Sequence, residues 1–397
     1  MRSVLFVVNY FNDIDHNAPL MERLAQQGDK VILLCLTKYS LFSDQRIKRL
    51  LKLKTFHLLR LRLLPRTSGS SNEKTGSLNI LQKLFRELIF SRFFSIAILR
   101  HFAVTHCVFT WGRPRAKGFQ RQIFIAAKCL KVPTLCLPHG QNIYKNYDVN
   151  TYLRNLNQNG SGWPDFSSRD EFDKYVVQTP RHRRMLLDWG MNPEKVLALG
   201  SMRFDEKWIK QNAALYPPIN IFQDEDENLK VVFFLPHWRY NVDEDSTIQL
   251  IAKIAAVPGI VLVVKGHTRG DSIDQRRYAH LSQYDHLIME ADHDSSPLIR
   301  WADVIINFGS SIAIEAIALR KPVINPAYLH TNHTVFDDTE AVLTTHSSQQ
   351  TTDGLEQLAR GGALKQDSQS IQQFLKDEVY AESALLDISD HYIRALL

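Results

Sequence analysis

Six short polar clusters directly follow apolar, strand-like runs of this chain, and they hold most of the side chains that could do chemistry. The clusters are NDIDH at 12–16, LPHGQN at 137–142, GSMRFD at 200–205, LPHWRYN at 235–241, VKGHTRG at 264–270 and NFGSSIAIEA at 307–316. Ligands of open parallel sheets bind beyond the carboxyl ends of the strands. The clusters therefore predict a binding site that is built from strand ends.

The residues Gly309, Ser310 and Ser311 are suited to holding a phosphate. They stand between a predicted strand and a predicted helix, so backbone N–H groups, two hydroxyls and the positive end of a helix would meet there. Such a site needs no metal ion to stabilise a leaving nucleotide. An ordinary serine N-cap is the structural alternative. Glu315, one turn further on, could accept hydrogen bonds from ribose hydroxyls or be an ordinary solvated acid.

Cationic side chains at two other strand ends could hold the same phosphate. Lys265 and His267 end a very apolar strand, where a charged group is costly unless it meets a partner. His237 and Arg239 end the preceding strand, and an arginine can form two parallel hydrogen bonds to a phosphate. We assign these four side chains, together with Arg203, to a donor-binding site. A solvated loop is the alternative for the residues of VKGHTRG.

Candidates for proton transfer lie in the first half of the chain. His139 is the first candidate for a general base or a donor-orienting group, because an imidazole titrates near neutral pH, and a structural histidine at a strand end is the alternative. Asp205 could act as a base, as a nucleophile in a double displacement, or as the partner of an arginine. Asp13 is the third catalytic candidate, although it could equally cap the next helix. His16 and Asn142 are placed on the acceptor side.

Strands and helices alternate along the chain and divide it in two. Strands of a first domain, with helices at 19–27 and 80–100, are predicted by apolar runs at 4–10, 31–36, 105–111, 132–138, 174–179 and 195–200. A second series is predicted by runs at 229–236, 259–266, 285–290, 302–308 and 321–326. Tyr216-Pro217-Pro218 and an acidic run separate the two series. The interpretation is an α/β protein with Rossmann-like domains at 1–215 and 216–374, a cleft between them, and a C-terminal helix at 375–397 that crosses back to the first domain.

The charge of the chain is distributed unevenly. Residues 44–100 carry 13 lysines and arginines against 3 acids, whereas the whole chain has a formal net charge of +6. The leucine-rich part of this stretch could rest on an anionic membrane surface or grip an anionic acceptor, and an ordinary solvated helix and strand is the alternative. Nucleic acid is not expected as a partner, because no recognised module accompanies the charge.

The composition places the protein in the cytoplasm, at most peripheral at the inner face of the membrane. No run approaches the roughly 20 apolar residues of a membrane span, and the start of the chain turns polar too early for a signal peptide. The four cysteines lack the spacing of metal ligands, so buried reduced thiols are expected and no structural metal.

Five of the motifs, taken in order between 133 and 326, resemble the superfamily of CDP-glycerol glycerophosphotransferases and capsule-type Kdo transferases. PHG is similar to its HG motif, GSMRFD to G-x-P-R-x-D, LPHWR to A-P-T-W-R, KGHT to its HP motif, and GSSIAIEAIALRKPVI to the segment that grips the donor phosphate. The resemblance implies a GT-B glycosyltransferase in which His139 is catalytic and Arg239, His267, Ser310 and Ser311 hold the donor phosphates. Departures such as Met202 for proline disfavour the glycerophosphotransferases.

The hypothesis is a metal-independent glycosyltransferase without a cofactor. It would move a sugar, with Kdo from CMP-Kdo the first guess, from a nucleotide-activated donor to a lipid-linked or oligosaccharide acceptor of lipopolysaccharide or capsule synthesis. One alternative is a CDP-glycerol or CDP-ribitol phosphotransferase. Another is a sugar-nucleotide 2-epimerase, which shares the architecture but needs carboxylates that are scarce in the motifs. The last is a non-catalytic scaffold with the same fold.

Overall fold

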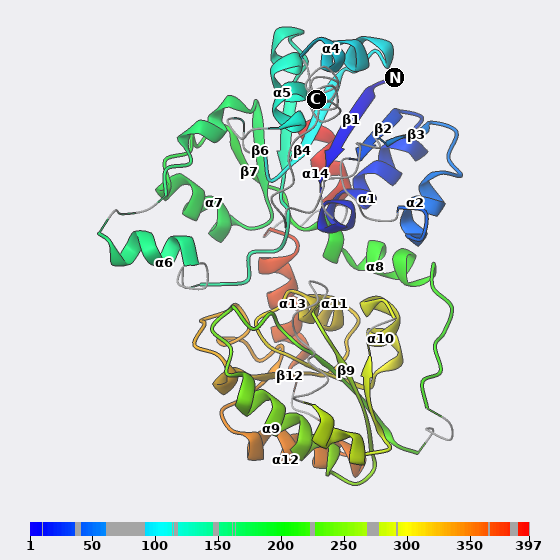
Figure 1. The fold of residues 1–397 in the computed structure, drawn as a ribbon, viewed down its shortest axis with the longest axis vertical. Helices are drawn as coiled ribbons and strands as arrows, with labels where there is room; N and C mark the ends of the chain where they lie inside the picture. Colours follow the sequence, from blue (N-terminus) through cyan, green and yellow to red (C-terminus); the bar gives the residue numbers. More distant parts are fainter. Residues whose placement is uncertain are drawn as a thin grey trace, which may run out of the picture. The chain divides into compact units, whose positions relative to one another are not determined.

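Two compact units make up the chain. The computed structural model describes residues 1–9, 11–35, 41–60, 92–112, 114, 118–145, 151–160, 162, 164–222, 227–267, 278–290, 293–363, 366–381 and 388–396. Unit 1 consists of Met1–Gly140, Asp165–Arg203 and Ala384–Leu397, and unit 2 of Gln141–Pro164 and Phe204–Ser383. Each unit has its own parallel sheet with helices (Figure 1). The predicted fold class, an α/β protein with two Rossmann-like domains of the GT-B type, is confirmed.

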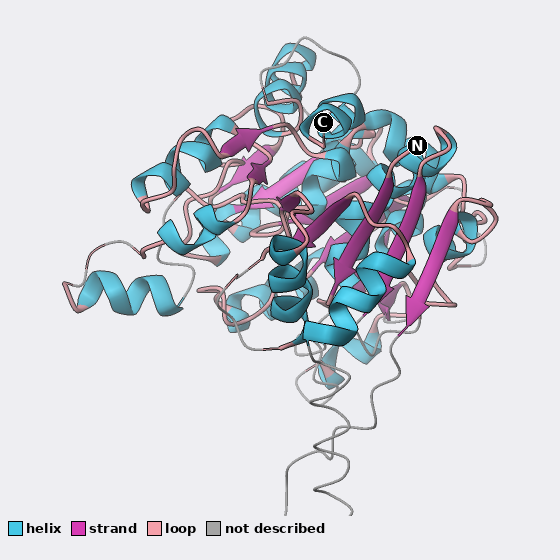
Figure 2. Ribbon diagram, turned by 90° about the horizontal axis from the view of Figure 1, so that it is seen from above, coloured by secondary structure: helices cyan, strands magenta, loops and turns pink. Residues whose placement is uncertain are grey.

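Unit 1 is built on a seven-stranded sheet with the order β3-β2-β1-β4-β5-β6-β7. The strands are β1 (Ser3–Val8), β2 (Lys30–Cys35), β3 (Phe56–Arg60), β4 (His106–Thr110), β5 (Thr134–Leu137), β6 (Lys174–Val177) and β7 (Val196–Ala198). The helices are α1 (Phe11–Gln26), α2 (Gln45–Leu50), α4 (Arg92–His101), α5 (Phe119–Cys129), α7 (Pro180–Asp188) and α14 (Ile388–Ala395), with short 3-10 turns η1 (Ser167–Glu171) and η2 (Met202–Phe204). β1 is buried along its whole length, as expected for a parallel strand covered on both faces. Figure 2 shows the strands of the fold among the helices.

Unit 2 is built on a six-stranded sheet with the order β10-β9-β8-β11-β12-β13. The strands are β8 (Leu229–Phe234), β9 (Ile260–Lys265), β10 (Leu287–Glu290), β11 (Val304–Asn307), β12 (Val323–Pro326) and β13 (Leu343–Thr345). The helices are α6 (Thr151–Gln158), α8 (Glu206–Ala213), α9 (Glu244–Ala255), α10 (Ser295–Trp301), α11 (Ile312–Ala318), α12 (Ser348–Ala359) and α13 (Ser368–Glu378), with 3-10 turns η3 (Ala279–Gln283) and η4 (Ala327–Leu329). A core of aliphatic residues from β8, β9, β11 and α9 holds these layers together.

Every strand predicted from an apolar run is present within a few residues, and two further strands were missed. β3 lies in the basic stretch, where only its first residue is fully buried, and β13 has three residues. Most of that basic stretch, 61–91, lies outside the described residues, as does most of the helix predicted at 80–100. No helix among the described residues is both long and apolar enough to cross a membrane.

The single helix predicted at 375–397 is wrong, because two helices cover this part of the chain. α13 begins at the Asp367 cap, whose carboxylate accepts a hydrogen bond from the Ser370 N–H, and it ends at Glu378. Ala381 then has a φ of +51°, a left-handed conformation that cannot continue a helix. α14 belongs to unit 1, where it packs against α1 and the Tyr392 hydroxyl donates to the Gly200 carbonyl at 2.7 Å.

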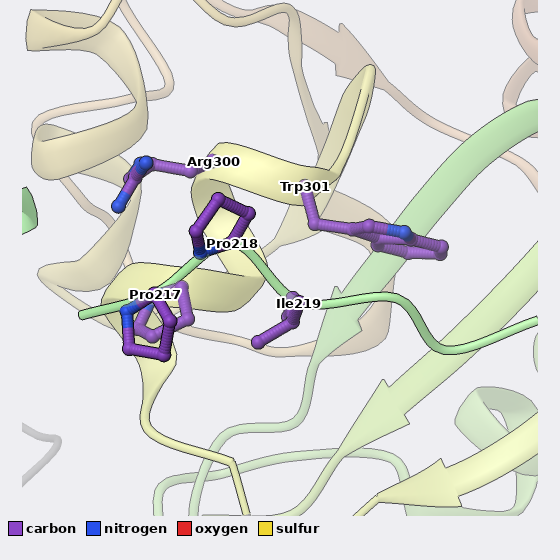
Figure 3. A pocket seen from close by; sticks show the side chains of 6 residues that line it. Pro217, Pro218, Ile219, Arg300 and Trp301 are labelled. Atoms are coloured by element: carbon purple, nitrogen blue, oxygen red, sulfur yellow. The ribbon is translucent and has the colours of Figure 1, made fainter.

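The units divide at Arg203 and Phe204 rather than at 215, and Gln141–Pro164 belongs to unit 2. The physical reason lies in α8 and the proline segment after it. Arg300 Nη1 donates to the carbonyls of Ala213 at 2.6 Å and Tyr216 at 3.2 Å, which ties the end of α8 to α10. The segment also lines a small pocket in unit 2 (Figure 3), formed by Pro217, Pro218, Ile219, Pro297, Arg300 and Trp301. The proline pair therefore packs on unit 2 instead of linking two domains freely.

The cysteines are free, and three of them, Cys35, Cys107 and Cys136, are buried as predicted. Cys129 is exposed, contrary to the expectation, because it lies in the last turn of α5. Burial raises the pKa of the Cys136 thiol to about 12, which keeps that thiol protonated and unreactive at neutral pH.

Candidate active site

His139 and Asp13 form a hydrogen-bonded pair at the carboxyl edge of the unit 1 sheet. His139 follows β5, and Asp13 stands in the first turn of α1, just after β1. His139 Nδ1 lies 2.7 Å from Asp13 Oδ1, and the Asn9 backbone N–H donates to Asp13 Oδ2 at 2.7 Å. The aspartate side chain is 1% exposed and the imidazole 27%. The buried carboxylate fixes the ring and supports the imidazolium that forms when the ring takes up a proton, which is the arrangement of a general base.

Arg203 lies in unit 1 as the partner of a buried carboxylate. Arg203 Nε is 2.7 Å from Asp15 Oδ2, and the guanidinium of Arg46 contacts the same carboxylate. Arg46 also pairs with Asp44, the N-cap of α2, at 2.7 Å. Burial alone would raise the pKa of Asp15, but the charges of Arg203 and Arg46 outweigh it and hold this pKa below its ordinary value. The charge of Arg203, which we predicted to meet a donor phosphate, is therefore already balanced within unit 1.

His16 is a buried residue of α1 and directly follows Asp15 in the chain. His16 is 4% exposed, and its Nε2 has no hydrogen-bond partner among the described residues. Burial, followed by the charge of Arg203, lowers the pKa of His16 to about 3, and His139 acts in the same direction. His16 is therefore a neutral imidazole at pH 7.

Two predicted site residues have local roles. Asp205 is the N-cap of α8, and its Oδ1 accepts the backbone N–H groups of Lys207 at 2.9 Å and Trp208 at 3.1 Å. Asn142 was placed on the acceptor side of the first domain, but it belongs to unit 2, where its Oδ1 accepts the Tyr144 N–H at 3.3 Å. A carboxylate at an N-cap satisfies backbone donors of the first helical turn, so the geometry of Asp205 is that of the capping residue.

The predicted phosphate-binding residues Gly309, Ser310 and Ser311, here called the phosphate loop, lie between β11 and α11 as expected. Gly309 has a φ of +63°, where glycine is favoured. Ser311 is the N-cap of α11, but its side chain makes no capping hydrogen bond, and Ser310 Oγ receives only a long one, at 3.4 Å from the Ile312 N–H. The ordinary N-cap explanation therefore does not account for these hydroxyls. Glu315 is 7% exposed, so it is not the solvated acid that was its alternative.

The other predicted donor residues stand at the ends of neighbouring strands. β9, β8 and β11 are adjacent in the sheet, so Lys265, His237 and the phosphate loop lie along one edge. Lys265 is 8% and His237 7% exposed, and the His237 and His267 ring centroids are 5.4 Å apart. The Arg239 backbone N–H donates to His237 Nδ1 at 3.2 Å. Arg239 itself is exposed, unlike Lys265 and His237.

Sequence reasoning missed Tyr144, which holds the phosphate loop. Its hydroxyl donates to the Gly309 carbonyl at 2.6 Å, and burial raises the pKa of the phenol, which keeps it a donor at neutral pH. Because a carbonyl and the next N–H point in opposite directions in a trans peptide, this bond directs the Ser310 N–H away from Tyr144. The segment that carries Tyr144 is held in unit 2, because the N–H of the next residue, Lys145, donates to the His333 carbonyl at 2.7 Å. Tyr144 follows no strand directly, so no pattern in the sequence marked it as a site residue.

His330 was also missed, although a signal existed. The Asn332 N–H donates to His330 Nδ1 at 3.0 Å, the same local pattern that His237 makes with the second residue after it. The His330 ring stacks on Phe308, next to the phosphate loop, with 5.5 Å between centroids. Its Nε2 is buried and has no hydrogen-bond partner in the described part of the chain. A histidine shortly after a strand, as here after β12, was the available signal.

No protein-family model matches the chain, and no curated protein matches it significantly. Solved structures do match. UDP-GlcNAc 2-epimerase from Neisseria meningitidis, solved with UDP-GlcNAc, gives a TM-score of 0.60 at 13% identity over 99% of both chains. The Methanocaldococcus jannaschii UDP-GlcNAc 2-epimerase, solved with UDP-GlcNAc and UDP, gives 0.57 at 12% identity over 100% of this chain and 99% of that one.

Anabaena HepE, solved in complex with UDP and glucose, gives a TM-score of 0.52 at 13% identity and covers 100% of this chain and 99% of its own. At these identities the likeness shows the fold alone, a GT-B-like pair of Rossmann-like domains. It singles out neither Kdo transferases nor CDP-glycerol transferases.

Proposed function

We propose that this chain is an enzyme that acts on a nucleotide-activated sugar, with the nucleotide held by unit 2 and a proton moved by His139 of unit 1. The hydrogen-bonded pair of His139 and Asp13 carries the proposal, because a buried carboxylate behind a partly exposed imidazole is what proton transfer needs. The phosphate loop at Gly309, with its two serine hydroxyls, supports nucleotide binding.

Glycosyl transfer is the reaction that this site supports best. The acceptor oxygen forms a bond to the anomeric carbon, the bond from that carbon to the nucleotide phosphate breaks, and the acceptor proton passes to His139. The phosphate loop and Lys265 stabilise the departing phosphate. Because the similar solved structures carry UDP or UDP-GlcNAc, UDP sugars replace CMP-Kdo as the first donors to test. A lipid-linked or oligosaccharide acceptor stays part of the proposal.

A sugar-nucleotide 2-epimerase is the second candidate, and the comparisons favour it over Kdo transfer. Inversion of a ring carbon breaks a carbon–hydrogen bond on one face of the sugar and forms one on the other. This reaction therefore requires a second proton carrier besides His139, whereas transfer to a hydroxyl requires one.

Nucleotide binding is tested by a thermal-shift panel with CMP, CDP, UDP and GDP on the wild type and on the Ser310→Ala, Ser311→Ala double variant. A nucleotide at 100 times its Kd adds about 2.7 kcal/mol to the free energy of unfolding. We expect a selective shift that the double variant loses. CMP would restore the Kdo donor and CDP the glycerol or ribitol phosphotransferase, whereas no shift with any nucleotide overturns the proposal.

The reaction is tested with UDP-GlcNAc in deuterium oxide. An epimerase incorporates deuterium at carbon 2 without an acceptor, whereas a transferase leaves that carbon unlabelled and releases UDP faster when a glycan acceptor is added. Since both reactions need His139, the His139→Asn variant is the control that ties either activity to this site.

A further inference from the structure

The strand ends of unit 1 are joined by hydrogen bonds that run from β5 to β7. His139, after β5, bonds to Asp13 of α1 at 2.7 Å. Gln178, directly after β6, donates from its side-chain nitrogen to the Gly140 carbonyl at 2.7 Å. Gly200, after β7, donates from its backbone to the Gln178 carbonyl at 3.0 Å. Three adjacent strand ends are thus tied to the helix that follows β1.

The chain of contacts then closes on α1 again. Beyond Gly200 and Ser201, the Arg203 side chain reaches Asp15 of α1 at 2.7 Å. His16 directly follows Asp15 in α1, so it belongs to the segment on which the circuit closes. We call the closed circuit the strand-end ring; it consists of Asp13, Asp15, His16, His139, Gly140, Gln178, Gly200, Ser201 and Arg203.

Three polar atoms of the strand-end ring are buried without a hydrogen-bond partner among the described residues. They are His16 Nε2, Gln178 Oε1 and Ser201 Oγ, on residues that are 4%, 1% and 1% exposed. A buried polar atom without a hydrogen-bond partner is unfavourable, because burial removes it from bulk water and no protein group replaces that bond. A ligand that offers hydroxyl groups removes this cost, since a hydroxyl can both donate and accept.

The charges of the ring argue for an uncharged ligand. Asp13 and Asp15 belong to it, and Asp44 adjoins it through Arg46, so carboxylates outnumber the guanidinium groups of Arg46 and Arg203. The three atoms without partners come from neutral side chains. A carboxylate ligand would therefore meet no net positive charge from these residues, whereas neutral hydroxyls meet matching donors and acceptors.

We propose that the strand-end ring, through His16, Gln178 and Ser201, binds an uncharged, hydroxyl-rich pyranose and presents one of its hydroxyls to His139. The proposal rests on the proposed function in one respect, since His139 must be the group that acts on that hydroxyl. It selects neutral sugars over acidic sugars such as Kdo for this part of the molecule.

The test is saturation-transfer NMR on the full chain with three probes at millimolar concentration: methyl glucoside, methyl N-acetylglucosaminide and methyl glucuronide. We expect at least one neutral glycoside to bind more tightly than the glucuronide. The Gln178→Ala, Ser201→Ala double variant should weaken that glycoside at least fivefold, about 1 kcal/mol. Ser201→Ala alone is the milder variant if the double variant does not fold.

Ser95→Ala is the matched control, because the Ser95 hydroxyl is also buried without a partner among the described residues but lies on α4, outside the ring. It should leave glycoside binding unchanged. The proposal is overturned if no neutral glycoside binds or if the glucuronide binds as tightly as the neutral glycosides. It is also overturned if the double variant binds the neutral glycoside as tightly as the wild type does. Nucleotide titrations of the same samples keep the two proposals apart, because loss of nucleotide binding bears on the phosphate loop and loss of glycoside binding on the ring.

Discussion

The strand ends of the two units carry different chemistry on similar sheets. In unit 1 the edge holds ion pairs and a hydrogen-bonded imidazole and carboxylate: Asp15 contacts two arginines, and His139 is bonded to Asp13. In unit 2 the edge holds rings, hydroxyls and backbone groups, with Tyr144 on the Gly309 carbonyl and the His237 ring beside that of His267.

The difference matches the proposed division of work, with proton transfer in unit 1 and nucleotide binding in unit 2. Charged pairs that are buried and mutually balanced keep an imidazole in place for proton transfer. Backbone N–H groups, hydroxyls and the ammonium group of Lys265 are donors that suit a phosphate. If this division holds, changes in unit 1 should affect turnover and acid stability, and changes in unit 2 should affect nucleotide affinity.

The largest effect is expected from His139→Asn. Without the imidazole no group takes the proton, so turnover should fall by about 10²- to 10⁴-fold. The Kd of the nucleotide should stay within a factor of about two, because the proposed nucleotide site lies in unit 2. Turnover and nucleotide titrations on one sample measure both. Asp13→Asn should reproduce the loss in part, and equal weakening of nucleotide binding by either variant would contradict the division.

The next effect is on stability. Asp15→Ala removes the carboxylate that Arg203 and Arg46 share, but Arg46 keeps Asp44 and the Arg203 side chain is 19% exposed. The free energy of unfolding should therefore fall by about 3 kcal/mol, the low end of the range for a broken buried pair. Urea unfolding measures it. The control is Arg360→Ala, which breaks an exposed pair with Glu356 on α12 and should cost at most about 0.5 kcal/mol. Similar losses in both variants would mean that the buried network has no special weight.

The fold could be predicted from the sequence because its strands are continuous apolar runs that only a covered parallel sheet accommodates. β3 was not predicted, because its residues after Phe56 are only partly buried or exposed and include polar ones, so no continuous apolar run marks the strand. The boundary escaped for a different reason. A proline pair normally signals a linker, but here Arg300 ties the preceding helix to unit 2, and such a long-range contact leaves no local pattern.

The candidate site was predicted where a polar cluster follows a strand, and missed where a residue acts from outside that pattern. Asp13 and His139 were both named, yet their pairing depends on β1 and β5 lying on one sheet. Tyr144 follows no strand, and its partner is a backbone carbonyl, which every residue carries. The pairing of Arg203 was not predicted, because its carboxylate partner, Asp15, lies far away in the sequence.

Acid stability should separate the units further. The pKa of His16 is about 3 in the folded chain and about 6.5 in the unfolded chain. Between these two values the unfolded chain binds a proton at His16 and the folded chain does not, so acid favours unfolding. Stability from this group is complete above pH 6.5 and falls by about 1.4 kcal/mol per pH unit on acidification. His16→Gln should therefore reduce the loss in urea midpoint between pH 7.5 and 5.5. An equal loss in both proteins would rule out burial of a neutral His16.

The smallest effect is expected from Tyr144→Phe, which removes one hydroxyl and keeps the ring. Without its bond to the Gly309 carbonyl, the peptide before Ser310 is no longer held, so its N–H points at a phosphate for only part of the time. One hydrogen bond of about 1 kcal/mol corresponds to roughly fivefold weaker binding of UDP. Uridine, which has no phosphate, should bind equally to both proteins, and Tyr240→Phe serves as the matched control because Tyr240 packs against Tyr144 at 6.4 Å between ring centroids. If Tyr144→Phe weakens uridine as much as UDP, the tyrosine supports the whole of unit 2 rather than the phosphate loop, and the contrast with the ion-paired edge of unit 1 loses its clearest element.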